Sequence, residues 1–428
     1  MFEASPEITI GQILCVVLAP IVMLYRLLNV IYCLIVNCRY KNKRFDKYVE
    51  SALPADAAFQ TDEWPSFQFM ESSFSDLPDW KTIRRRMNRW AKQNFGTDSN
   101  IVMTDKTSTD FVNQLMRSKP SEVIRGASHL FVYCPSNNSI VGLCDHYYCD
   151  GHALRAFVRC MFYDDNNKMR YSAFPKYRYI PLLSDSMVLN LARRQVSDTF
   201  WYPSQISGVA DQTRIMCQMF DSSGVGRKWD RWCTFTRSTL HMFDAMPDVE
   251  YLRFGLTVAF DTDQTFANNR IGIIIVRIRR PASKTYDEQF DDIIEQYKEQ
   301  CTNNYTDAHT SYDVLRHFSS AALRSAGRKA IDAVFTTMYS EDELPMMLRG
   351  IGGFAGPQLD GEYLYINVIT CGSRSQVTYV SNLKQMNYDL LERYGMETRY
   401  SFPHLELDLS KRSSAASTES LASSDPEQ

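Results

Sequence analysis

Histidine, aspartate and glycine stand at a spacing suited to proton transfer in the segment His146-Tyr-Tyr-Cys-Asp150-Gly151. A neutral imidazole, with an ordinary pKa of about 6.5, can accept a proton from a hydroxyl or amine at cytosolic pH. Such a base lets the nucleophile attack a thioester carbonyl directly, because the two substrates meet at the imidazole and no acyl-enzyme is needed. We therefore predict that His146 is the general base of an acyl transfer.

Asp150 and Gly151 have supporting roles in this prediction. The Asp150 carboxylate can hold the local backbone through a basic partner, without touching the substrate. Gly151 permits close approach of its backbone, and its N–H could stabilise a developing oxyanion. The alternative is that His146 is a structural or exposed histidine and that Asp150-Gly151 is an ordinary turn. We expect His152 to lie in the first turn of a helix, not to act as a second base.

The flanking sequence predicts how the motif is positioned. Two β-rich runs, His129–Cys134 and Ser139–Cys144, are separated by Pro135-Ser136-Asn137-Asn138, which is typical of a turn between paired strands. After Gly151 the apolar residues follow the spacing of one buried helical face: Leu154, Phe157, Val158, Met161 and Phe162. The motif is therefore expected between a strand and a helix.

The rest of the chain mixes helical and strand patterns. Helices are predicted over Asp79–Phe95, Asp287–Cys301, Val314–Phe335 and Leu383–Tyr394. Strands are predicted over Leu252–Phe260, Ile271–Arg277, Tyr363–Thr370 and Gln376–Ser381. Residues 163–230 are polar and read as a crossover between two lobes. We expect an α+β fold with mixed sheets, divided into an anchor (1–45), a lobe with the HxxxDG motif (46–205), a second lobe (206–410) and a disordered tail (411–428).

Composition narrows the function classes. The chain has 428 residues, is 44% hydrophobic and carries a net charge of −3, which fits a globular protein and gives no support to nucleic-acid binding. The basic run Arg84-Arg85-Arg86 is read as a solvated helix face. The 11 cysteines form no CxxC pair, so we read them as reduced thiols. Because no Cys/His cluster has zinc spacing, no metal site is predicted.

The N-terminal stretch Ile8–Val36 is almost entirely apolar and is long enough to span a bilayer. Basic residues follow it from Arg39 to Lys47, which places the remainder of the chain in the cytosol by the positive-inside rule. Pro20 and Arg26 leave a monotopic interfacial anchor as an alternative, and a buried core helix as another. The expected location is the cytosolic face of a membrane, either endoplasmic reticulum or lipid droplet.

The HxxxDG segment resembles that of the coenzyme-A-dependent acyltransferase superfamily, which has the chloramphenicol-acetyltransferase-like fold. Two later segments are similar to parts of the wax ester synthase/diacylglycerol acyltransferase group: Leu256–Phe260 followed by Asn269-Arg270-Ile-Gly272, and Gly352-Gly353-Phe-Ala-Gly356-Pro357. The order and spacing of the three segments agree with that group. The sequence departs from it at Asp145, where the group has a first histidine. The Asp-Phe-Gly-Trp-Gly motif of the plant BAHD acyltransferases is absent.

The resemblance implies two similar lobes with a tunnel between them and His146 at its middle. Acyl-CoA would enter as co-substrate, with no bound cofactor, and the acceptor would enter from the other face. Together with the anchor it implies a lipid hydroxyl as acceptor, from a fatty alcohol, a diacylglycerol or a sterol-like alcohol. Two alternatives remain: a non-lipid amine or secondary-metabolite acceptor, and a catalytically inactive member that binds ligands.

Overall fold

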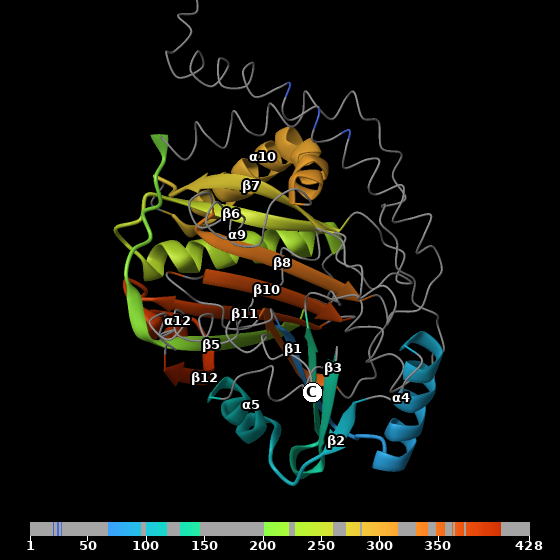
Figure 1. Ribbon diagram of the computed structural model, residues 1–428. Coiled ribbons are helices and arrows are strands. Elements are labelled where there is room, and N and C mark those ends of the chain that lie inside the picture. The colour runs from blue at the N-terminus through green and yellow to red at the C-terminus, as the bar shows by residue number, and fades with distance from the viewer. Residues whose placement is uncertain are drawn as a thin grey trace, which may run out of the picture.

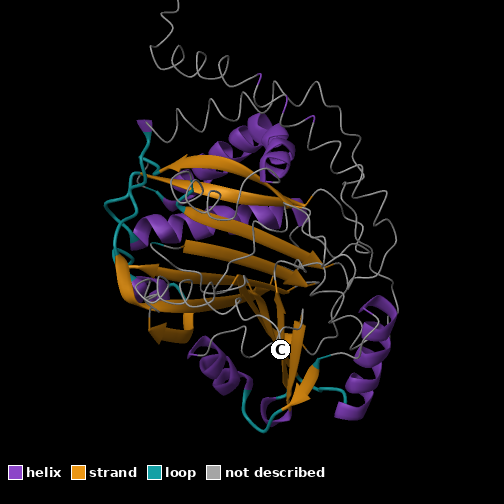
Figure 2. Ribbon diagram, viewed as in Figure 1, coloured by secondary structure: helices purple, strands orange, loops and turns teal. Residues whose placement is uncertain are grey.

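The computed structural model describes part of the first predicted lobe and most of the second (Figures 1 and 2). The described residues are 67–95, 100–117, 129–145, 201–221, 227–259, 271–282, 285–315, 331–340, 348–355, 364–371 and 374–403, with single positions at 20, 24, 27 and 362. The prediction for Ile8–Val36 therefore lies outside the described residues except at Pro20, Leu24 and Leu27, which are helical and exposed. Within the described ranges, no helix combines the length and the apolar character that a membrane span requires.

The described chain contains five α-helices and twelve strands. The helices are α4 (Trp80–Phe95), α5 (Ser108–Arg117), α9 (Arg227–Ala245), α10 (Tyr286–Leu315) and α12 (Tyr388–Arg393). The strands are β1 (Phe67–Phe74), β2 (Ile101–Met103), β3 (His129–Cys134), β4 (Ser139–Asp145), β5 (Val209–Asp221), β6 (Tyr251–Ala259), β7 (Ile271–Arg279), β8 (Ala333–Ser340), β9 (Leu348–Ala355), β10 (Leu364–Cys371), β11 (Arg374–Leu383) and β12 (Glu397–Pro403).

These strands form two sheets, one of five strands in the order β2-β3-β4-β1-β9 and one of seven in the order β12-β5-β11-β10-β8-β6-β7. Each sheet contains parallel and antiparallel pairs: β2 is parallel to β3, and β8 is parallel to both β6 and β10. The predicted α+β fold with mixed sheets is confirmed.

The hairpin that leads to the motif forms as predicted. A 3-10 helix at Pro135–Asn137 joins β3 to β4, and Asn138 follows it in the left-handed region at φ 49°. Asparagine tolerates this conformation better than most residues, which explains its place at the end of the turn. Its backbone N–H donates to the Pro135 carbonyl. β4 then runs back along β3 in full register, from Ser139 opposite Cys134 to Cys144 opposite His129.

The two faces of the five-stranded sheet are covered by different partners. On one side Trp80, at the start of α4, packs against Tyr133, with ring centroids 5.5 Å apart. On the other side α5 packs into a cluster that includes both sheets. Its members are Val112, Leu115, Leu130, Val132, Cys134, Val141, Leu143, Ile215, Cys217, Val380 and Tyr400. This cluster joins the two lobes through apolar contact.

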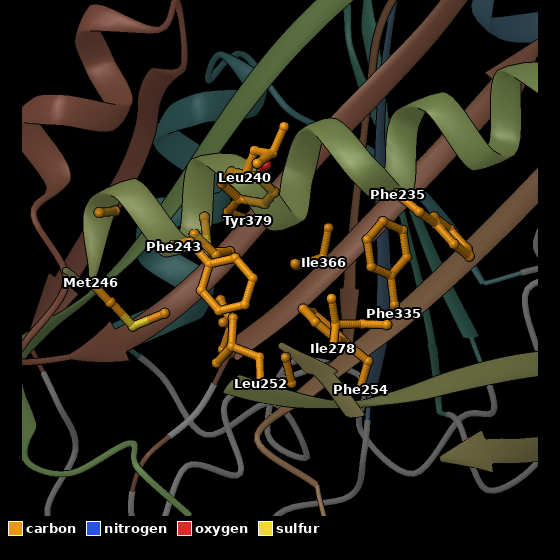
Figure 3. Close-up of a cluster of buried hydrophobic side chains, with 14 of the residues drawn as sticks. Phe235, Leu240, Phe243, Met246, Leu252, Phe254, Ile278, Phe335, Ile366 and Tyr379 are labelled. Atoms are coloured by element: carbon orange, nitrogen blue, oxygen red, sulfur yellow. The ribbon is translucent and has the colours of Figure 1, made fainter. Parts of the chain in front are cut away.

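The largest core lies on the far face of the seven-stranded sheet, where α9 and α10 pack (Figure 3). α9 contributes Phe235, Leu240 and Phe243, Met246 follows directly after its end, and the strands beneath it contribute Leu252, Phe254, Ile278, Phe335, Ile366 and Tyr379. These side chains come from alternate positions of each strand, and on β5, β10 and β11 the opposite positions, such as Ile215, Tyr365 and Val380, face the five-stranded sheet. α9 and α10 therefore cover one face of this sheet, and its other face is turned towards the region between the lobes.

The five-stranded sheet takes one strand from the second half of the chain. β9 lies within the stretch assigned to the second lobe, yet it pairs with β1, with Gln68 opposite Ala355 and Ser73 opposite Gly350. β9 also contacts β10 and β11 of the other sheet. A division of the chain at residue 206 therefore does not divide the two sheets from each other.

Two helix predictions need correction. Val314 and Leu315 end α10, but Ala333, Val334 and Phe335 are the first residues of β8, so the helix predicted over Val314–Phe335 is wrong at its end. The β-branched and aromatic content of Ala333–Ser340 favours a strand. The helix predicted over Leu383–Tyr394 is shorter, because Leu383 still belongs to β11 and Asn387 caps α12 through Leu390 N.

Candidate active site

The three predicted catalytic residues, His146, Asp150 and Gly151, and the helix expected after them lie outside the described residues. The structure does describe the strand that leads into them. β4 ends at Asp145, the residue before His146, and it lies between β3 and β1 in the sheet. A strand with a neighbour on each side has a fixed direction and register, so it can present the start of the motif at a defined place.

The end of β4 is close to the end of β9. Phe67 of β1 pairs with Asp145 of β4, and its neighbour Gln68 pairs with Ala355 of β9. The carboxyl ends of β4 and β9 therefore lie at the same end of the sheet. β4, which leads into His146–Gly151, and β9, which holds Gly352–Ala355 of the other selected segment, therefore end on the two sides of β1. Gly352 and Gly353 are strand residues opposite Glu71 and Met70.

A row of polar side chains crosses the face of the seven-stranded sheet that faces the other lobe. We name it the polar ladder, and it consists of Thr257, Thr336, Asn367, Thr378 and Cys217. The register aligns its members, since Thr336 pairs with Asn367, Asn367 with Thr378, and Thr378 with Cys217. Leu256 pairs with Phe335, so Thr257 lies next to Thr336 in the same row.

Hydrogen bonds fix the orientation of these side chains. Thr336 Oγ1 donates to Asn367 Oδ1 at 2.9 Å, so it accepts the bond of 2.8 Å that it shares with the hydroxyl of Tyr365. Thr378 Oγ1 lies 3.6 Å from Cys217 Sγ and accepts from Gln376 Nε2 at 3.4 Å. Tyr365 also packs against the apolar cluster that joins the two sheets. The polar ladder is therefore a preorganised wall on the side of the five-stranded sheet.

The titratable groups of this wall are neutral at physiological pH. Burial raises the pKa of Tyr365 to about 12, and the hydrogen bond with Thr336 opposes that rise only in part. Burial also raises the pKa of the Cys217 thiol above its usual range, so Cys217 is a poor nucleophile. The polar ladder thus contains neutral hydroxyl, amide and thiol groups that contact one another, and Asn367, Thr378 and Cys217 are buried.

The second segment selected from the sequence contributes to this wall in part. Leu256 and Val258 face the core behind the sheet, whereas Thr257 belongs to the polar ladder. Gly272 pairs with Val258 at the start of β7, and Asn269 and Arg270 lie outside the described residues. The polar ladder was not predicted as a site. Its sequence signal is Asn367 inside the apolar run Leu364–Cys371, where a buried polar residue is unusual.

A separate small cavity lies on the opposite, helix-covered face of the same sheet. Its lining includes Gln218, Arg237, Ser238, His241 and Tyr379. Its size suits about one water molecule and excludes an acyl chain. No three His, Cys, Asp or Glu side chains gather as potential metal ligands in the described part of the chain.

Comparison with known proteins identifies the fold. No protein-family model matches the chain, and no curated protein is significantly similar to it in sequence. The structure is similar to that of TRI3 trichothecene 15-O-acetyltransferase from Fusarium sporotrichioides, with a TM-score of 0.56 over 79% of this chain and 92% of that one, at 10% identity. It also matches a starter condensation domain of rhizomide synthetase RzmA solved with C8-CoA, with a TM-score of 0.46, 11% identity and coverage of 79% and 90%. The chain therefore has the two-sheet fold of the chloramphenicol-acetyltransferase-like proteins, as predicted.

Proposed function

We propose that this protein is an acyl-CoA-dependent acyltransferase in which His146 is the general base. The observation that supports the proposal most directly is the position of β4, which ends at Asp145 beside the end of β9. The HxxxDG segment follows this strand directly in the chain, and an O-acetyltransferase has a similar fold. The polar ladder provides a neutral, hydrogen-bonding wall on the opposing sheet.

In the proposed reaction the His146 imidazole removes the proton of an acceptor hydroxyl as its oxygen attacks the thioester carbonyl. The backbone N–H of Gly151 stabilises the oxyanion, and Asp150 holds the loop that carries the base. Collapse of the tetrahedral intermediate breaks the carbon–sulfur bond, and the imidazolium returns its proton to the departing thiolate. The products are an ester and free coenzyme A, and the enzyme returns to its starting state.

The acceptor in this proposal is a lipid hydroxyl, from a fatty alcohol, a diacylglycerol or a sterol-like alcohol. Its support is the apolar stretch Ile8–Val36, which would hold the catalytic lobes at the cytosolic surface of the endoplasmic reticulum or of a lipid droplet. Fatty acyl chains and lipid alcohols concentrate in such surfaces, so an anchored enzyme meets both substrates there.

Replacing the base tests the mechanism. His146→Ala should lower acyl transfer by at least about 100-fold, because general-base catalysis contributes about 10²–10⁴-fold. His152→Ala is the matched control, since it removes a neighbouring histidine that has no role in the proposal. Thioester cleavage is followed with a panel of acyl-CoAs in purified full-length protein. Full turnover by His146→Ala would show that the mechanism is wrong.

A second acceptor class has support of its own. TRI3 is a trichothecene 15-O-acetyltransferase, so the shared fold accommodates a hydroxyl of a secondary metabolite in that protein. Lipid extracts of cells that express this chain distinguish the two classes. New wax ester, triacylglycerol or sterol ester would support the lipid acceptor, whereas thioester cleavage without a new neutral lipid would favour a non-lipid acceptor. No cleavage of any acyl-CoA would leave the inactive, ligand-binding alternative.

A further inference from the structure

A buried carboxylate links the two sheets. Glu71 lies in the middle of β1, its side chain is 0% exposed, and its three partners come from two other elements, α5 and β12. Glu71 Oε1 accepts from Ser108 Oγ at 2.5 Å and from Arg399 Nη2 at 2.9 Å, and Glu71 Oε2 accepts from the Tyr400 hydroxyl at 2.6 Å. Ser108 Oγ in turn accepts from Asn137 Nδ2 at 2.8 Å. We name this group the Glu71 clamp.

An irregularity in β12 makes the clamp possible. Neighbouring side chains of a regular strand point to opposite faces, so Arg399 and Tyr400 would not normally reach the same carboxylate. The register of β12 against β5 shifts between Thr398, opposite Met216, and Tyr400, opposite Ile215. Arg399 is therefore the extra residue of a β-bulge, and bulges redirect side chains in this way. Because of the bulge, both side chains reach Glu71.

The Glu71 clamp holds β1, which lies between β4 and β9. Glu71 pairs with Val141 of β4 on one side and with Gly352 of β9 on the other. Four residues along β1, at a distance of about 13 Å, Phe67 pairs with Asp145 at the end of β4. A rotation of β1 relative to β12 would displace the ends of β4 and β9 relative to the opposing sheet.

We propose that Glu71, held by Arg399 and Tyr400, is a positioning residue that fixes the angle between the two sheets and so places the ends of β4 and β9 for acyl transfer. This inference rests on the function proposed above. A buried charged group is costly to desolvate, and an apolar residue could fill the same space at no loss of stability. The directional bonds of Glu71 to α5 and β12 give a defined orientation between the sheets, which an apolar residue would not provide.

Glu71→Gln removes the charge and keeps the shape, and Asp332→Asn is its control. Asp332 forms a buried ion pair with Arg253 at 2.8 Å, but both residues belong to the seven-stranded sheet and its connections. A milder matched pair is Tyr400→Phe and Tyr297→Phe. Each loses one buried hydroxyl, from the clamp in the first case and from the Thr239 bond between α10 and α9 in the second.

The first measurement does not depend on catalysis. Spin labels at the exposed positions Ser75 and Lys384, introduced as unnatural amino acids because the chain has 11 cysteines, report the distance between the two sheets. We expect a broader distance distribution in Glu71→Gln and Tyr400→Phe, and an unchanged one in Asp332→Asn and Tyr297→Phe. An unchanged distribution in both clamp variants would overturn the proposal. If Glu71→Gln does not fold, Tyr400→Phe carries the test.

The second measurement is steady-state kinetics of the same variants, well below their melting temperatures. Misplacement of the strand ends should lower kcat by about 10- to 100-fold in Glu71→Gln, with a much smaller change in KM for acyl-CoA. The controls should keep kcat within about twofold. Full kcat in a variant with a broadened distance distribution would show that the clamp does not position the site. Absence of acyl transfer in the wild type would reject the proposed function, while the distances would still decide whether the clamp exists.

Discussion

His241 shows how its surroundings set the charge of a single side chain. Its imidazole stacks on Tyr394, with ring centroids 4.5 Å apart and an interplanar angle of 19°. The pKa of His241 is lowered to about 4, mainly by burial and also by the positive charge of nearby Arg237, while Asp244 opposes the shift. The Asp244 carboxylate accepts a hydrogen bond from the Tyr394 hydroxyl at 2.7 Å. His241 is therefore neutral in the folded protein at physiological pH.

This shift predicts a dependence of stability on pH. In the unfolded chain a histidine binds its proton near pH 6.5, whereas folded His241 does so only near pH 4. The stabilisation is therefore complete above pH 6.5 and is lost as the pH falls towards 4, by at most about 3 kcal/mol. Urea unfolding of wild type and His241→Gln between pH 7.5 and 4.5 measures it. Parallel loss of stability in the two proteins would contradict the prediction.

Residue types and spacing predicted the candidate chemistry but not the contacts of the Glu71 clamp. HxxxDG is a local pattern of six residues, so the sequence alone could select it. Glu71 and Tyr400 are 329 residues apart, and no periodicity in the chain connects them. The clamp further depends on a bulge that lets two adjacent residues share a partner, which alternation rules would assign to opposite faces.

At the scale of elements, the sequence predicted best where apolar residues followed a helical period or formed a short run bounded by turn residues. Asp79–Phe95, His129–Cys134 and Ser139–Cys144 agree with α4, β3 and β4 to within one residue at each end. β1 was missed because Glu71 and Ser72 are both buried, which breaks the alternation of a half-exposed strand. β5 was missed within the polar stretch 163–230, where its polar residues suggested a loop.

β7 lies at the edge of the seven-stranded sheet, where α10 supplies the hydrogen bonds that another strand would give. Gln300 Oε1 accepts from Arg277 N at 2.8 Å, and Gln300 Nε2 donates to Arg277 O at 2.7 Å. Gln296, one helical turn earlier, does the same for Arg279, at 2.8 and 3.2 Å. The two primary amides thus occupy the sites at which a further strand would pair.

Removal of these amides should expose a pairing edge. We expect the double variant Gln296→Ala/Gln300→Ala to self-associate with increasing concentration, because the backbone of Arg277 and Arg279 becomes available to another chain. Sedimentation velocity over a concentration series measures this. Glu295→Ala/Glu299→Ala on the same helix is the control and should sediment as wild type does. Equal sedimentation of the two double variants would show that the glutamines do not protect the edge.

At the scale of the whole molecule, three features tie the sheets together: the strand β9, the apolar cluster around α5, and the Glu71 clamp. We therefore expect residues 1–205 alone not to fold. The fragment would lack the partner of β1 in the sheet and both clamp residues of β12, which leaves a buried carboxylate without its cation.

Limited proteolysis and thermal unfolding of the purified fragment measure this expectation. The fragment should be cleaved rapidly and show no cooperative transition, and co-expression with residues 206–428 should restore protection. A fragment that unfolds cooperatively on its own would show that the first sheet does not need β9.

The pairing of β1 with β9 also determines when the five-stranded sheet can be completed during synthesis. A ribosome that has just made β1 must add about 270 residues before β9 appears, which takes on the order of tens of seconds at 5–20 residues per second. During that interval the edge of β1 that β9 will occupy waits for its partner, with Met70, Ser72 and Phe74 not yet in their final environment. Chaperones that shield nascent strands should therefore matter more for this chain than for one whose sheets are completed in order of translation. Synonymous codon changes that slow elongation between β1 and β9 leave the amino-acid sequence unchanged. They should nevertheless lower the yield of folded protein.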